Sequence, residues 1–113
     1  MLIEQGATLT DVDPYEPETA ELDLTRVLQA LGDPVRLHIV RVLATGGERA
    51  CGTVQLEVGK ATRSHHFRVL REAGITRTRV EGTHRFVSLR RDDVESRFPG
   101  LLDAVLVPQR APA

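Results

Sequence analysis

Apolar residues at helical spacing begin near residue 24. Four of them follow the i, i+3, i+4, i+7 pattern of an amphipathic helix: Leu24, Val27, Leu28 and Leu31. The Gly-Asp-Pro run at 32–34 then ends this helix and starts another, because glycine suits a C-terminal cap, aspartate caps the next helix and proline fits a first turn. A second helix is therefore expected from Pro34 to about Ala44.

Two more helices are expected before residue 74. A short third helix is predicted over about 49–58, with Val54 and Leu56 pointing inward. Gly59 permits a tight turn, and a fourth helix is predicted over about 60–73, ended by Gly74.

The hydrophobic period changes to two after residue 74. The segments 75–80 and 83–89 are rich in β-branched residues and are joined by Glu81-Gly82, which predicts a β-hairpin. Asp92-Asp93 offers an N-terminal cap for a last helix that is broken near Pro99-Gly100. The expected fold is therefore mainly α, with five helices and one hairpin between the fourth and the fifth.

The chain of 113 residues has room for one domain, which we place at 23–107. Residues 1–22 form an acidic N-terminal arm that we expect to be flexible, and 108–113 a flexible tail. No apolar run is long enough to span a bilayer, and the first residues do not resemble a signal peptide. A cytoplasmic protein without a membrane partner is expected.

Charge is separated along the chain, although the formal net charge is only −1. Residues 1–23 hold seven acidic side chains and no basic one, whereas 60–91 hold nine basic side chains and two acidic ones. A local basic surface of this kind favours a polyanionic partner, most simply double-stranded DNA.

A basic helix followed by a basic hairpin is the outline of a winged helix-turn-helix, which reads DNA with a helix in the major groove. On the fourth helix, Phe67 and Leu70 share the inward side. The candidate DNA contacts on its outward side and margin are Thr62, Ser64, His65 and Arg68. Those on the hairpin wing, 75–89, are Arg77, Arg79, His84 and Arg85. They are expected to form one continuous basic platform.

Two stretches carry a resemblance to a known family. They are ALGDPVRLHIVRVL at 30–43 and SHHFRVLREAGI at 64–75, and with the hairpin they resemble the ArsR/SmtB family of arsenical-repressor-like regulators. The resemblance implies a homodimer joined through the first and last helices, which binds a palindromic operator and usually represses. One position departs from the family: Arg63 stands where an apolar residue is usual. Two interpretations stay open for it, a phosphate contact, which we favour, and a packing role.

The family's usual metal sites are not matched here. Cys51 is the only cysteine, so a Cys-x-Cys pair is absent, and 90–107 contain no histidine. A nickel or zinc site that joins a histidine to N-terminal acids of the other subunit stays open, as do a small effector and a protein co-regulator. A second function also stays open, that of a winged-helix module which acts mainly through a protein partner. No nucleophile, base and carboxylate stand together in a pattern that indicates an enzyme.

Overall fold

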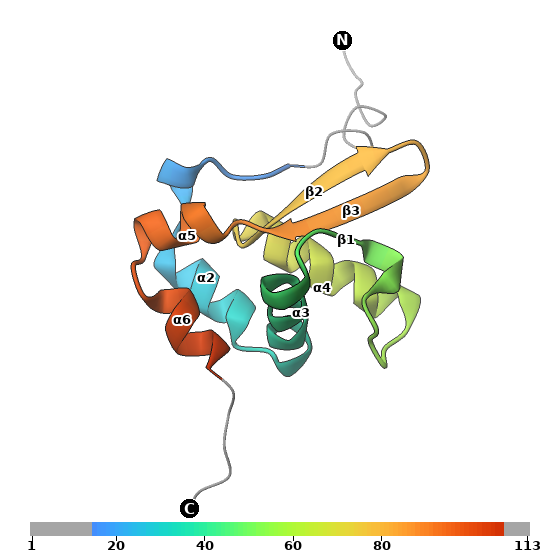
Figure 1. The fold of residues 1–113 in the computed structure, drawn as a ribbon, viewed down its shortest axis with the longest axis horizontal. Coiled ribbons are helices and arrows are strands. Elements are labelled where there is room, and N and C mark those ends of the chain that lie inside the picture. The colour runs from blue at the N-terminus through green and yellow to red at the C-terminus, as the bar shows by residue number, and fades with distance from the viewer. Residues whose placement is uncertain (1–14, 108–113) are drawn as a thin grey trace, which may run out of the picture.

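Five α-helices and a three-stranded antiparallel sheet make up residues 15–107, the part of the chain that the computed structural model describes (Figure 1). The elements in chain order are η1 (Thr19–Glu21), α2 (Leu24–Leu31), α3 (Pro34–Gly46), β1 (Arg49–Ala50), η2 (Cys51–Thr53), α4 (Lys60–Glu72), β2 (Thr76–Glu81), β3 (His84–Leu89), α5 (Arg91–Arg97) and α6 (Leu101–Leu106). Both η elements are single 3-10 turns. The mainly α fold with a hairpin is confirmed.

The predicted junction between the first two helices is confirmed. The Asp33 carboxylate caps α3 by accepting hydrogen bonds from the backbone N–H groups of Val35 and Arg36, at 2.9 and 3.1 Å. Arg36 donates from Nε to the Ala30 carbonyl at 2.7 Å. These bonds fix α3 against the end of α2.

The predicted third helix over 49–58 is wrong. Its first two residues form β1, which pairs antiparallel with β3, and η2 follows as one short turn. Gly52 and Thr53 have low helix propensity, and pairing with β3 satisfies backbone groups that a helix would otherwise use. Val54 is nevertheless buried, and Leu56 packs against the core as expected.

The sheet has the order β1-β3-β2, and β2 pairs with β3 from Thr76↔Leu89 to Glu81↔His84. The hairpin loop is therefore Gly82-Thr83, one residue later than predicted, with Gly82 at φ 62°. Successive side chains of a strand point to opposite sides of the sheet, so the wing has two faces. The inner face is turned toward α4 and carries Thr76, Thr78, Val80, Arg85, Val87 and Leu89; the outer face carries Arg77, Arg79, Glu81, His84, Phe86 and Ser88.

Two buried clusters hold these elements together. The larger one joins α2, α3, α4 and the sheet through side chains that include Val27, Ile39 and Leu70. The smaller one packs Leu22 against Val94 of α5 and Leu102 of α6. The last helix is broken at Pro99-Gly100 as predicted, although α5 begins at Arg91, so that Asp92 and Asp93 lie in its first turn instead of capping it.

The N-terminal segment, residues 15–22, packs on the domain and differs in this from the flexible arm expected there. Pro17 and Leu22 are buried, and the Arg90 guanidinium donates to the Pro17 carbonyl at 2.8 Å. Residues 1–14 of the predicted arm and the predicted tail at 108–113 lie outside the described residues. Among the helices of 15–107, none has the length and apolar character needed to cross a bilayer.

Candidate nucleic-acid interface

Helix α4 has a buried side and a polar side, as the sequence predicted. Phe67 and Leu70 are buried in the core, and His66 is buried beside Arg36 of α3, with Nδ1 3.2 Å from the guanidinium. The predicted DNA contacts Thr62, Ser64, His65 and Arg68 are all exposed. Arg68 Nη2 lies 3.4 Å from His65 Nδ1, so these two side chains share one patch of surface.

The outer face of the wing is not a simple basic surface. Arg79 lies between Glu48 and Glu81, with nitrogen–oxygen distances of 2.9 and 3.1 Å, and its guanidinium stands 4.5 Å from the Phe86 ring centre. Hydrogen bonding to Arg79 lowers the pKa of the Glu48 carboxyl, and the two carboxylates raise the pKa of Arg79. Predicted contact His84 is exposed on this face as well.

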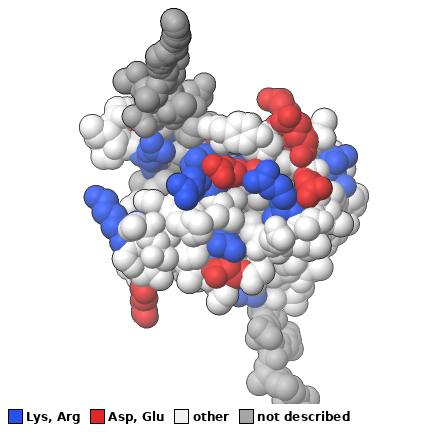
Figure 2. Space-filling view, turned by 180° about the vertical axis from the view of Figure 1, so that it is seen from behind, with Lys and Arg blue, Asp and Glu red and all other residues white. Residues whose placement is uncertain are grey.

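Arg77 on the same outer face also faces carboxylates. Its Nε lies 3.5 Å from Glu16 of the N-terminal segment, and its Nη2 lies 3.4 Å from Asp93 of α5. Figure 2 shows basic and acidic side chains interleaved over the face that is seen from behind. The continuous basic platform predicted for residues 60–91 is therefore wrong: the cations of the wing are divided between two faces.

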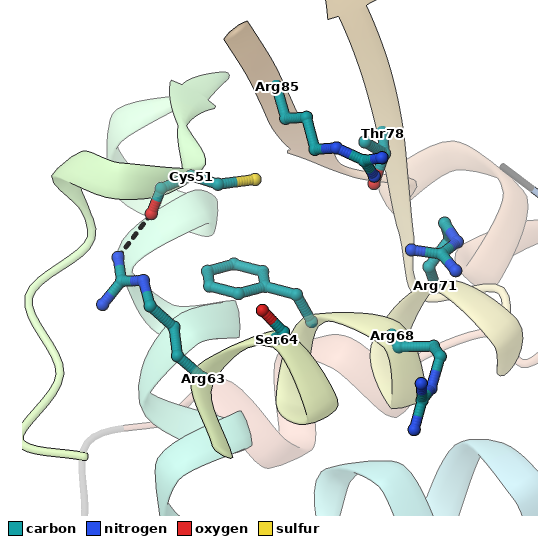
Figure 3. A pocket seen from close by; sticks show the side chains of 8 residues that line it. Cys51, Arg63, Ser64, Arg68, Arg71, Thr78 and Arg85 are labelled. Atoms are coloured by element: carbon teal, nitrogen blue, oxygen red, sulfur yellow. Dashed lines mark hydrogen bonds between the residues drawn. The ribbon is translucent and has the colours of Figure 1, made fainter. Parts of the chain in front are cut away.

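Arg85 stands on the inner face and points toward α4. Between this face, η2 and α4 lies an open hollow of about 440 Å³ (Figure 3). The residues that line this hollow are Cys51, Arg63, Ser64, Phe67, Arg68, Arg71, Thr78 and Arg85. Arg71 and Arg85 extend into it from the helix and from the wing, whereas the Arg68 guanidinium turns away from Cys51 (Figure 3).

Arg71 was not among the residues predicted to contact DNA. Its side chain follows Ser64 by seven positions and Phe67 by four, so all three share one stripe of α4. That spacing was visible in the sequence, but only the position of the wing shows that the stripe faces a second basic side chain.

Comparison with known proteins identifies the fold and the family. Residues 31–79 match a family model described as a helix-turn-helix domain. The HTH-type transcriptional regulator YceK of Bacillus subtilis (strain 168) is 41% identical over 83 residues, which cover 71% of this chain and 83% of YceK. The structure of the transcriptional repressor BigR from Xylella fastidiosa is 30% identical, with a TM-score of 0.57, and the match covers 76% of this chain and 88% of that one.

The structure of the ArsR family transcriptional regulator RHA00566 has a TM-score of 0.59 at 18% identity, covering 84% of this chain and all of that one, which shows a shared fold. This chain belongs to the ArsR family. The family consists of winged helix-turn-helix transcriptional regulators, not enzymes, and such regulators bind double-stranded DNA.

In this ArsR-family regulator, Arg63 joins α4 to the preceding loop. Its Nη2 donates to the carbonyls of Cys51 and Val54, and its guanidinium stands 5.6 Å from the Phe67 ring centre. These contacts favour the packing interpretation of Arg63 over the phosphate contact that the sequence favours. Arg63 thus stands where the family usually has an apolar side chain, and it connects the two segments by donating hydrogen bonds to two backbone carbonyls.

Cys51 of this regulator lies at the edge of the hollow. Burial raises the pKa of its thiol, although the positive charges of Arg85, Arg63 and Arg71 act in the opposite direction. The side chain is therefore a protonated thiol at neutral pH.

Metal ligands do not gather in the described part of this regulator. Among residues 15–107, no three His, Cys, Asp or Glu side chains stand close enough together to hold a metal ion. His66 Nδ1 lies 3.9 Å from the Asp33 carboxylate, but that carboxylate caps α3. Of the N-terminal acids invoked for a nickel or zinc site, Glu4, Asp11 and Asp13 lie outside the described residues.

Proposed function

We propose that this ArsR-family regulator is cytoplasmic, binds a palindromic operator as a homodimer and represses transcription. Helix α4 enters the major groove and the wing lies along the flanking backbone. The observation that carries this proposal is the exposed polar side of α4, where Thr62, His65 and Arg68 stand opposite the buried Phe67 and Leu70. The name of the related BigR, a transcriptional repressor, supports the direction of regulation.

The homodimer is proposed through α2 and α6, which lie toward the same end of the molecule (Figure 1). Three large apolar side chains on these helices and just after them are exposed: Leu24 at 45%, Leu28 at 47% and Val107 at 60%. Exposed apolar groups of this size favour a protein partner. Joining two copies here would present two α4 helices to successive major grooves of one operator.

On the wing, Arg85 is the first candidate for a backbone contact, because it lies on the inner face beside α4. Arg77 and Arg79 can bind phosphate only in exchange for their carboxylate partners, which costs part of the energy gained. Arg77, Arg79 and His84 lie on the outer face, which is turned away from α4, and we place them in a secondary role for that reason.

Replacing Arg68 with alanine tests the groove assignment. With an operator selected from random duplexes, Arg68→Ala should weaken binding by about 1–3 kcal/mol and relax the base preference at one position of each half-site. Fluorescence anisotropy on the operator and on its single-base variants measures both effects. Arg91→Ala, which removes an exposed arginine at the start of α5, is the matched control and should bind as the parent does. Unchanged affinity and base preference in Arg68→Ala would overturn the assignment.

A further inference from the structure

The side chain of Arg36, in the first turn of α3, contacts both α2 and α4. Its Nε donates to the Ala30 carbonyl at 2.7 Å, and its Nη2 donates to the Gln29 carbonyl at 3.3 Å. Both carbonyls belong to the last turn of α2, where the donors of a next turn are missing and a positive charge is favourable. The Nη1 of Arg36 lies 3.2 Å from Nδ1 of His66 on α4. One guanidinium therefore joins three helices.

His66 depends on this contact for its hydrogen bonding. The residue is only 8% exposed, so a ring nitrogen without a partner would be costly. A guanidinium has donors only, so Nδ1 is the acceptor and the neutral ring carries its proton on Nε2. The Asp33 carboxylate, 3.9 Å from Nδ1, cannot replace Arg36, because a carboxylate is itself an acceptor and this one caps α3.

Packing between α2 and α4 is incomplete beside this bridge. An open pocket of about 270 Å³ lies there, and residues of both helices line it together with Arg36. Gln29 lines it from α2, and His65 and Val69 line it from α4. Because side chains that interlock are what makes a helix pair rigid, the two helices are less firmly fixed on this side of their contact. Their angle therefore depends here on the polar bridge.

We propose that Arg36 is a positioning residue: by joining the last turn of α2 to His66, it fixes the angle between α2 and the recognition helix α4, and thereby sets the spacing of half-sites that the homodimer accepts. In a dimer joined through α2, the placement of one α4 helix relative to the other includes this angle once in each chain. Neither bond of the bridge involves the wing, which contacts the same half-site as α4. This inference rests on the proposed function.

The spacing of half-sites tests this role. Arg36→Met keeps a long, flexible side chain but removes its donors. Affinity is measured by fluorescence anisotropy for the selected operator, for operators with a shorter or a longer spacer, and for a single half-site. Operator affinity should fall roughly tenfold, and the differences between spacers should shrink. The affinity for a single half-site and the sedimentation equilibrium of the dimer should remain those of the parent, because neither depends on the angle between α2 and α4.

Variants of His66 separate positioning from stability. His66→Asn keeps an acceptor near the place of Nδ1 and should retain the spacing preference of the parent. His66→Leu fills the core but removes the acceptor. It should lose the spacing preference as Arg36→Met does, and the double variant should lose no more, because both substitutions break the same bond. Should Arg36→Met fail to fold in circular dichroism melting, His66→Leu removes that bond from the other side.

Arg41→Met is the matched control. It removes the same charge from the same helix, at a guanidinium whose Nε has no hydrogen-bond partner among the described residues. Operator affinity should change by no more than about threefold, and the spacing preference should not change. An equal loss of spacing preference in Arg41→Met and Arg36→Met would show that charge on α3, and not the bridge, is responsible.

Two further outcomes separate this inference from the proposed function. If Arg36→Met keeps the spacing preference, or loses half-site and operator affinity equally, the positioning role is wrong and the proposed function stands. If the parent binds no palindromic operator, the proposed function fails, and residual dipolar couplings of the protein without DNA decide the rest, because they measure the angle between α2 and α4. An angle that changes in Arg36→Met but not in Arg41→Met would support the bridge, and an unchanged angle would reject it.

Discussion

The Asp33 carboxylate connects three parts of the structure. It caps α3 through two backbone N–H groups, and one of its oxygens lies 3.9 Å from the buried His66 of α4. The hydrogen bond from the Arg36 N–H lowers the pKa of Asp33 below its ordinary value of 3.8, and the charges of Arg36 and His66 add to the effect, while burial opposes it. Because the folded state holds the ionised form, the stabilisation is present above the unfolded pKa and is lost as the pH falls through the folded one.

Substitutions at Asp33 should separate its charge from its hydrogen bonds. Asp33→Ala should lower the free energy of unfolding by about 1 kcal/mol at neutral pH, because the cap is lost. Asp33→Asn keeps a capping oxygen, so it should lower the free energy of unfolding at neutral pH by less than Asp33→Ala does. Below pH 3.8, the stability of Asp33→Asn should fall less steeply than that of the parent. Urea unfolding at a series of pH values measures both. If the free energy of unfolding falls equally steeply with decreasing pH in Asp33→Asn and in the parent, a group other than Asp33 is responsible for that fall.

At the scale of elements, local sequence patterns predict the helices and the hairpin. They do not predict the pairing of strands that lie far apart in the chain. The cap at Asp33 and the apolar stripe through Phe67 and Leu70 act within a few residues, so the sequence alone reveals them. The segment at 49–58 is different, because β1 exists only through its pairing with β3, nearly forty positions later. The carboxylate partners of the wing could not be predicted for the same reason: Glu16 and Glu48 approach it from distant parts of the chain.

Glu16 in the N-terminal segment also occupies the edge of the wing. Its carboxylate accepts a hydrogen bond from the Thr78 backbone N–H at 2.6 Å and pairs with Arg77. It therefore places a negative charge on the element that is proposed to approach DNA, and it stabilises the edge of β2 at the same time.

Glu16→Gln should strengthen DNA binding while leaving the fold intact. The amide oxygen can still accept from Thr78, and loss of the partly exposed ion pair with Arg77 costs about 1 kcal/mol of unfolding free energy. Affinity for a duplex should rise a few-fold at low salt, and the gain should shrink as salt is added. Glu18→Gln removes the same charge from an exposed position in the same segment and is the control for anisotropy titrations. Equal gains in both variants would show that only net charge counts.

The whole molecule carries its exposed apolar side chains and the surface that is proposed to face DNA on different elements. Of the four residues in the apolar stripe of α2, Val27 and Leu31 are buried in the core, while Leu24 and Leu28 remain exposed. A single chain therefore leaves part of that stripe uncovered, whereas α4 and the wing keep polar surfaces. This division allows two copies to associate through α2 and α6 without covering either α4 helix.

Leu28→Glu tests the association and its role in operator binding together. The side chain is 47% exposed, so the substitution should change the folding stability of one chain by no more than about 0.5 kcal/mol. It should shift sedimentation equilibrium from dimer to monomer, because a charge cannot be buried unpaired in an apolar interface. Operator affinity should then fall to that for a half-site, and lengthening the spacing between half-sites should no longer affect it, since only a dimer couples the two. Thr25→Glu adds the same charge to an exposed polar position of α2 and should leave the dimer intact. A Leu28→Glu protein that sediments as the parent does would move the interface away from α2.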